Sequence, residues 1–147
     1  MSEAQPLSKT ERPTPSRGDV LADLLNGVDH IAPVISRHRQ DSEINRTLSP
    51  DVVRAMREVG LFRMKSPHEV GGAEIHPVDQ MAVVEAVVKL DSAAAWTMFI
   101  GATVTGRALS ALSDEAVDEL MTAPDFPIMA GSLKPSGSAT KVDDGFR

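Results

Sequence analysis

The chain has 147 residues, 41% of them hydrophobic, which is enough for one core of ordinary size. Its formal net charge is −6, its 15 Lys and Arg are spread along the sequence, and it has only four Phe and one Trp, so nucleic-acid binding is not expected. Because there is no cysteine, the sequence excludes disulfides, thiolate metal sites and cysteine nucleophiles.

The first residues carry no recognisable targeting signal. Residues 1–17 are rich in Ser, Thr, Pro and charge and contain no apolar run long enough for a signal peptide, so we expect a disordered tail there. The longest uncharged run, Ser92–Gly106, is 15 residues long, whereas a bilayer requires about 20. The sequence therefore predicts a cytoplasmic protein without a membrane partner.

Two amphipathic helices come first. Apolar residues recur at helical spacing from Gly18 onward and predict a helix with one buried face. These residues are Leu21, Leu24, Leu25, Val28, Ile31, Ala32 and Ile35. A second helix should begin with Ser49 as its cap and Pro50 at its first position, and should end at Gly60.

A loop and a central helix follow. Pro67 and Gly71-Gly72 interrupt the helical period, and because no Gly-Lys-Ser/Thr follows, a tight turn is preferred over a phosphate-binding loop. Pro77 should restart a helix. Its stretch Met81–Leu90 is apolar on nearly every side except for an expected Glu85–Lys89 pair, so we expect it to lie centrally.

The next two helices are also marked by their capping residues. Asp91 should cap a helix from Ser92 to about Leu112, with small residues that allow close packing and large apolar ones around Trp96, so it should be fully buried. Ser113 should open a short last helix, which Pro124 closes.

Extended segments come only at the end. Short strands are expected at 128–130 and 138–142, with Asp144-Gly145 as the two central residues of a hairpin turn and Phe146-Arg147 as the start of its second strand. This order predicts a mainly α chain, with a helical domain at 18–123 and the first strands of a truncated β domain at 124–147. We therefore expect the front part of a larger protein.

Few side chains indicate chemistry directly. The four histidines show no spacing typical of metal ligands, so no metal site is predicted. Asp91 is better explained as a cap than as a catalytic acid, and Ser132 and Ser138 have no histidine near them in sequence to activate them. Trp96 is the best functional candidate, although core packing is the preferred explanation for a Trp in a buried helix and the two roles can coexist.

Several local patterns occur in a fixed order from about Asp19 to the end. They are Leu61-Phe62-Arg63 with Pro67 and Gly71-Gly72, then Asp91-Ser92-Ala93-Ala94-Ala95-Trp96, then Gly101-Ala102-Thr103, and finally Ala130 to Gly137 leading into Val142–Arg147. Together with the order of elements, this series resembles the acyl-CoA dehydrogenase superfamily. The resemblance implies an N-terminal helical domain, a β-barrel domain and a C-terminal four-helix bundle, with a flavin between the last two.

The resemblance also implies where ligands bind. The helix from Ser92 would form a wall of the substrate cavity, with Trp96, Phe99, Ile100 and Thr103 as substrate-binding residues. Flavin contacts would come from Ser132, Leu133, Pro135 and Ser138. Because this sequence has Leu133-Lys134-Pro135 where dehydrogenases typically have Thr-Glu-Pro, backbone groups would replace the threonine hydroxyl. The catalytic residues are unknown, since the dehydrogenase base belongs to the C-terminal bundle.

The residues around Trp96 indicate which branch of the family the sequence resembles. Dehydrogenases often carry a histidine shortly after this position, whereas no histidine follows His76 here, and a Trp after the alanines resembles the flavin-dependent monooxygenases. That implies a small-molecule substrate, FAD or FMN in the complete protein, a flavin reductase as partner and a homo-oligomer, with this fragment inactive alone. The alternatives are an acyl-CoA dehydrogenase acting on CH–CH groups and a free-standing, non-catalytic helical interaction module.

Overall fold

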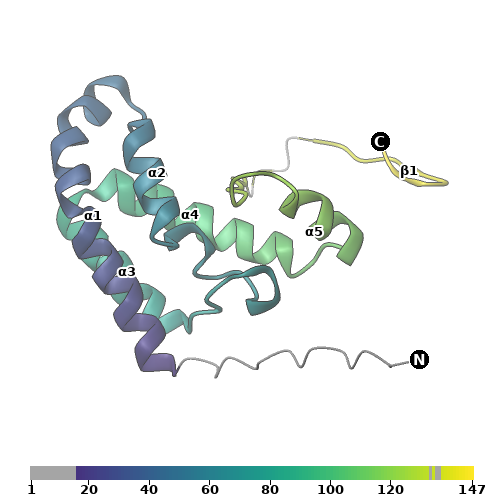
Figure 1. The fold of residues 1–147 in the computed structure, drawn as a ribbon. Coiled ribbons are helices and arrows are strands. Elements are labelled where there is room, and N and C mark those ends of the chain that lie inside the picture. The colour runs from purple at the N-terminus through teal and green to yellow at the C-terminus, as the bar shows by residue number, and fades with distance from the viewer. Residues whose placement is uncertain (1–15, 133, 135–136) are drawn as a thin grey trace, which may run out of the picture.

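The structure, a computed structural model, describes residues 16–132, 134 and 137–147. In this part of the chain, five α-helices are followed by two short strands, so the prediction of a mainly α fold is confirmed (Figure 1). Helix α3 packs against both α1 and α4, and α2 packs against α1. None of the described helices is both long enough and apolar enough to cross a bilayer.

Helix α1 spans Arg17–Asn45 and buries Leu24, Val28, Ile31 and Ile35, as the apolar spacing predicts. It begins one residue before the predicted boundary because Ser16 and Asp19 form a capping box, in which each side chain accepts a hydrogen bond from the backbone N–H of the other residue, both at 3.2 Å. Ser16 and Arg17 are therefore ordered. The rest of the predicted tail, residues 1–15, lies outside the described residues.

Helix α2 spans Pro50–Glu58 and has the predicted ends. The Ser49 hydroxyl accepts a hydrogen bond from the backbone N–H of Asp51 at 3.3 Å. After the helix, Gly60 has φ 80°, a left-handed conformation that costs glycine little. Local signals within a few residues therefore determine this element.

The loop that follows contains two short 3₁₀ helices, η1 (Leu61–Arg63) and η2 (His68–Val70). Gly71 has φ 75°, and a Cβ on Gly72 would lie only 2.0 Å from the carbonyl oxygen of Ser66. The second glycine is thus required because two backbone segments touch at this point. The prediction of a tight turn at Gly71-Gly72 is confirmed.

Helices α3 (Pro77–Leu90) and α4 (Ser92–Leu109) are joined at Asp91, whose carboxylate caps α4 by accepting the Ala94 N–H at 2.7 Å. The predicted Glu85–Lys89 pair forms at 2.9 Å. The prediction that both helices are almost wholly buried is wrong, since Met81 is 58% exposed and Trp96 is 67% exposed. Each helix has neighbours on only part of its circumference.

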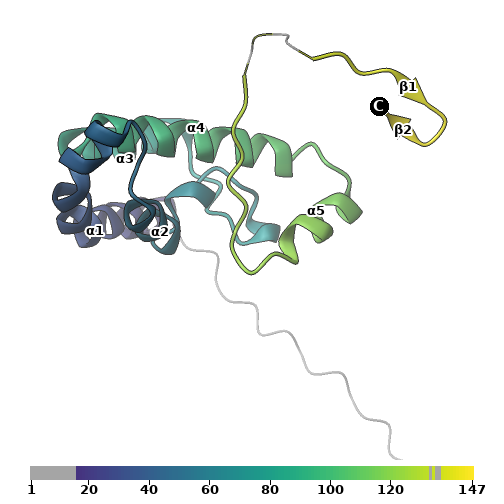
Figure 2. The same cartoon turned by 90° about the horizontal axis from the view of Figure 1, so that it is seen from above.

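Helix α5 spans Asp114–Met121 and begins, as predicted, with Ser113 as its cap. It packs loosely, with Val117 as its one buried residue. The chain then runs in an extended conformation across α4 (Figure 2). The strand predicted at 128–130 does not form, because this segment packs on a helix and pairs with no strand among the described residues.

The hairpin lies apart from the helices (Figure 2). Strands β1 (Lys141–Val142) and β2 (Gly145–Phe146) pair antiparallel with Val142 opposite Gly145, so the turn residues are Asp143-Asp144 and not the predicted Asp144-Gly145. Neither aspartate has positive φ, and Gly145 takes φ 145° within the strand. The strand expected from Ser138 is shorter because β2 offers few partner residues, although two 2.9 Å bonds between Thr140 and Arg147 extend the pairing.

Candidate functional site: an apolar groove between α3 and α4

A groove of about 250 Å³ lies on the outer face of α3 and α4. Its lining side chains are almost entirely apolar: Met81, Val84, Val88, Ser92, Ala95, Trp96 and Phe99. The rings of Trp96 and Phe99 lie with centroids 6.3 Å apart and planes tilted by 38°, a separation typical of aromatic pairs. The groove can therefore offer flat, apolar surface to a ligand.

The structure brings the four residues predicted to contact substrate onto one face of α4. Trp96, Phe99, Ile100 and Thr103 follow the spacing i, i+3, i+4, i+7 that aligns side chains along a helix, and we refer to them as the aromatic stripe. Trp96 and Thr103 are exposed, while Phe99 and Ile100 are half-buried. The preferred sequence interpretation of Trp96, core packing, is wrong, because a side chain 67% exposed is not part of a core.

Sequence analysis missed the contribution of α3. Met81, Val84 and Val88 line the groove, and the buried Gln80 donates from Nε2 to Oγ1 of Thr103 at 3.3 Å. A glutamine in an apolar helix is a weak signal of such a contact. The hydrogen bond holds the Thr103 hydroxyl at one end of the stripe.

Two of the residues predicted to contact flavin, Ser132 and Ser138, lie in extended parts of the chain after α5. Ser132 and Ser138 are both exposed, and Leu133 and Pro135 lie outside the described residues. The Ser132 hydroxyl accepts from the backbone N–H of Lys134 at 3.2 Å, so its own proton remains available to a ligand. None of the described residues exchanges a backbone hydrogen bond with Ala130, Gly131 or Ser132. These open donors and acceptors fit a segment that contacts a polar cofactor.

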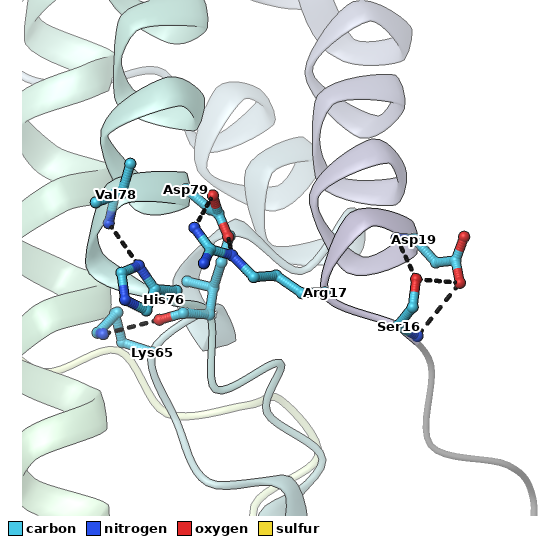
Figure 3. Close-up of polar contacts among 8 residues, drawn as sticks. Ser16, Arg17, Asp19, Lys65, His76, Val78 and Asp79 are labelled. Carbon is cyan, nitrogen blue, oxygen red and sulfur yellow. Dashed lines mark hydrogen bonds and ion pairs between the residues drawn. The ribbon is translucent and has the colours of Figure 1, made fainter.

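A second cavity, of about 460 Å³, lies where the first turns of α1 and α3 meet the loop before α3 (Figure 3). Its lining includes Arg17, Lys65, His68, Glu74 and His76. The guanidinium of Arg17 makes a two-point contact with the carboxylate of Asp79, with Nη2 2.8 Å from Oδ1. Lys65 donates to the carbonyl oxygen of Ile75 at 3.0 Å. These cations already have partners within the protein.

The imidazoles of this polar cavity also have partners. His76 caps α3 by accepting the Val78 N–H on Nδ1 at 3.2 Å, and Nε2 of His68 lies 3.8 Å from the Glu74 carboxylate. We therefore assign these groups to the joining of α1, the loop and α3. The apolar groove, which none of the described residues covers, is the better candidate for a ligand site.

The ion pair in the polar cavity makes stability depend on pH. The hydrogen bond from Arg17 lowers the pKa of Asp79 against the opposing effect of desolvation. A lowered folded-state pKa means that the pair contributes its stability above the unfolded-state pKa of about 3.9 and loses it as the pH falls through the folded-state value. Asp79→Asn is therefore expected to destabilise the protein at neutral pH and to flatten the acid dependence of its urea midpoint.

Asp29→Asn provides the control for this prediction, because Asp29 is an exposed aspartate on α1. It should leave both the neutral-pH midpoint and the acid dependence unchanged. If Asp79→Asn loses stability on acidification as steeply as the unmodified protein does, the assigned role of the Arg17–Asp79 pair is incorrect.

No cluster of His, Cys, Asp and Glu suited to a metal ion occurs among residues 16–132, 134 and 137–147. The capping role predicted for Asp91 is the one that the structure shows, whereas the hairpin turn lies at Asp143-Asp144, one residue before the predicted pair. The described site is therefore one of apolar surface and a few hydrogen-bonding groups.

Comparison with known proteins relates this arrangement to enzymes. The chain is 24% identical over 123 residues to the flavin-dependent monooxygenase, oxygenase subunit HsaA, of Rhodococcus jostii (strain RHA1), covering 83% of this chain and 32% of that protein. It is 28% identical over 130 residues to indole-3-acetate monooxygenase of Pseudomonas putida, covering 88% of this chain and 32% of that protein. The chain thus spans about a third of the length of these curated relatives.

The fold is also found in a solved structure. XiaF from Streptomyces sp., in complex with FADH2 and glycerol, superposes with a TM-score of 0.80 at 20% identity, covering 89% of this chain and 33% of XiaF. Residues 27–121 match the family described as acyl-CoA dehydrogenase, N-terminal domain. The chain therefore belongs to the acyl-CoA dehydrogenase family.

Proposed function

We propose that these residues form the N-terminal part of a flavin-dependent monooxygenase that uses reduced flavin and oxygen to hydroxylate an aromatic or similar small molecule. The observation that carries the proposal is the exposed apolar groove, in which Trp96 and Phe99 lie open to a ligand. Two relatives that are named monooxygenases support it over a dehydrogenase acting on CH–CH groups.

In this proposal the aromatic stripe is one wall of the substrate site. Contact with Trp96 and Phe99 would remove apolar ligand surface from water, and their ring faces favour a planar ligand. Thr103, held by Gln80, would supply one polar contact that orients the ligand along α4. The protein's contribution is binding, orientation and exclusion of water.

The segment from Ser132 to Ser138 would contact the flavin, through the Ser132 hydroxyl, backbone groups near Leu133 and Pro135, and Ser138. When bound, the reduced flavin would supply the electrons for activation of oxygen. Whether the flavin is FAD or FMN, we propose that a separate reductase delivers it, in keeping with the description of HsaA as an oxygenase subunit. We also propose that the full-length protein forms a homo-oligomer.

Flavin binding and turnover provide the test. The complete product of the gene is supplied with FAD or FMN, a flavin reductase, NADH and oxygen, with indole-3-acetate as the first probe. We expect oxygen-dependent formation of a hydroxylated product and no flavin binding at sub-micromolar concentration by the 147 residues alone. Tight binding and turnover by these residues alone would contradict the proposed division of the protein, while failure of the complete product to bind any flavin would favour the non-catalytic interaction module.

The role of Trp96 is tested separately. Trp96→Ala is expected to raise KM for the probe about tenfold, equivalent to about 1.4 kcal/mol, with a smaller change in kcat, because an apolar contact to the substrate is lost. Trp96→Phe should retain most of the affinity. Since the side chain is exposed, neither variant should alter the unfolding midpoint.

Thr97→Ala is the control for Trp96, since this exposed neighbour on α4 lines no part of the groove. It should leave KM unchanged. An unchanged KM in Trp96→Ala would remove Trp96 from the substrate site.

A further inference from the structure

Helix α4 also holds the extended segment that leads to Ser132. The Thr105 hydroxyl, which is completely buried, accepts the backbone N–H of Met129 at 2.8 Å. One turn earlier, a Cβ on Gly101 would lie 3.2 Å from Cγ2 of Ile128, and a Cβ on Gly131 would lie 3.5 Å from both γ-carbons of Val104. The hydrogen bond thus holds the segment Ile128–Gly131, which lies along α4 close to Gly101 and Val104.

The hydrogen bond to Thr105 is the important polar contact. Among the described residues, the other polar link between this part of the chain and the helices is the ion pair of Arg57 with Asp125 at 3.1 Å, in which the Asp125 side chain is 71% exposed. Exposed ion pairs contribute about 0–1 kcal/mol, whereas a hydrogen bond whose acceptor is fully buried contributes about 0.5–1.5 kcal/mol. Removing the Thr105 hydroxyl should therefore release the segment more effectively than removing the ion pair.

Both the aromatic stripe and the segment that leads to Ser132 lie against or on α4. Thr105 lies two residues after Thr103, about 200° further around the helix, so the aromatic stripe and the segment Ile128–Gly131 occupy different sides of the same helix. Ser132 follows Met129 by three residues, a reach of at most about 10 Å. If the Met129 backbone becomes more mobile, the position of Ser132 should therefore become less well fixed as well.

We propose that Thr105 is a positioning residue that fixes Ser132 at a set distance from the aromatic stripe. Gly101 assists by leaving room for Ile128 between α4 and the segment. The functional part of this inference, alignment of the flavin contacts with the substrate wall, depends on the proposed function. The fastening of the segment to α4 does not.

Amide hydrogen exchange tests the fastening without any flavin. In Thr105→Val the side chain keeps its size and loses its acceptor, so the Met129 amide should exchange about five- to tenfold faster relative to buried amides of α4. Thr105→Ser, which keeps the hydroxyl, should stay within about twofold of the unmodified protein. Thr97→Val, an exposed threonine on the same helix, should change nothing. Equal exchange at Met129 in Thr105→Val and the unmodified protein would overturn the proposal.

Flavin affinity of the complete gene product tests the functional part. Thr105→Val should raise the dissociation constant for FAD or FMN, measured by fluorescence quenching, about fivefold, and Thr105→Ser should restore it. Met129→Pro removes the N–H donor instead of the acceptor and should weaken flavin binding to the same extent. This second variant allows the same test if Thr105→Val fails to fold. Faster exchange with unchanged flavin affinity would overturn the positioning role. Absence of flavin binding in every protein, unmodified included, would refute the proposed function, and the exchange result would still decide the fastening.

Discussion

Phe62→Ala is expected to lower the free energy of unfolding by about 3–5 kcal/mol, the cost of removing a large aromatic side chain from a core. Phe62 is 1% exposed and lies in η1, which packs against α2 and α4. Its ring is so close to α4 that a Cβ on Gly101 would lie 2.9 Å from Cδ1. Urea unfolding followed by circular dichroism measures the change.

Phe146→Ala is the matched control, because Phe146 is 74% exposed in the hairpin. It should change the free energy of unfolding by less than about 0.5 kcal/mol. A loss in Phe146→Ala as large as that in Phe62→Ala would show that the hairpin contributes to the core as much as η1 does, contrary to this prediction. Since typical domains have about 5–15 kcal/mol of stability, Phe62→Ala is expected to leave a marginal protein.

Gly72→Ala is expected to cost about 3 kcal/mol, because the added carbon would overlap two carbonyl oxygens, and a backbone cannot move aside as a flexible side chain can. The Cβ would lie 2.0 Å from the oxygen of Ser66 and 2.7 Å from that of Pro67. Local disruption should also weaken the bond from the Glu74 N–H to the Ser66 carbonyl, now 3.1 Å long. Thermal unfolding and exchange of the Glu74 amide report the two effects.

Gly71→Ala separates backbone conformation from steric overlap. Nothing lies within 4 Å of a Cβ on Gly71, so only its φ of 75° opposes the substitution, at a cost of about 1–2 kcal/mol. Gly137→Ala, in open space with no positive φ, should be neutral. A smaller loss in Gly72→Ala than in Gly71→Ala would mean that the loop can move away from Ser66.

The candidate site depends on α4 more than on any other element. One side of this helix packs on the core through Met98 and Ala102, another presents the aromatic stripe, and a third holds the segment Ile128–Gly131. Under the proposed function, this helix would keep the substrate wall and the cofactor contact in register.

The candidate site could be predicted only in part. The spacing of Trp96, Phe99, Ile100 and Thr103 is a property of one helix, and it places them on one face whatever surrounds them. Their partners across the groove, Met81, Val84 and Val88, depend on how α3 packs beside α4. No local pattern in the sequence contains that information.

The sequence by itself determined where three of the helices begin, because the caps Ser49, Asp91 and Ser113 act on backbone groups within three residues. Only the tertiary structure decided which apolar faces are covered, that Arg17 pairs with Asp79 across 62 residues, and that residues 128–130 lie on a helix instead of forming a strand. Those outcomes depend on contacts between distant segments, and their free energies exist only once the chain has packed.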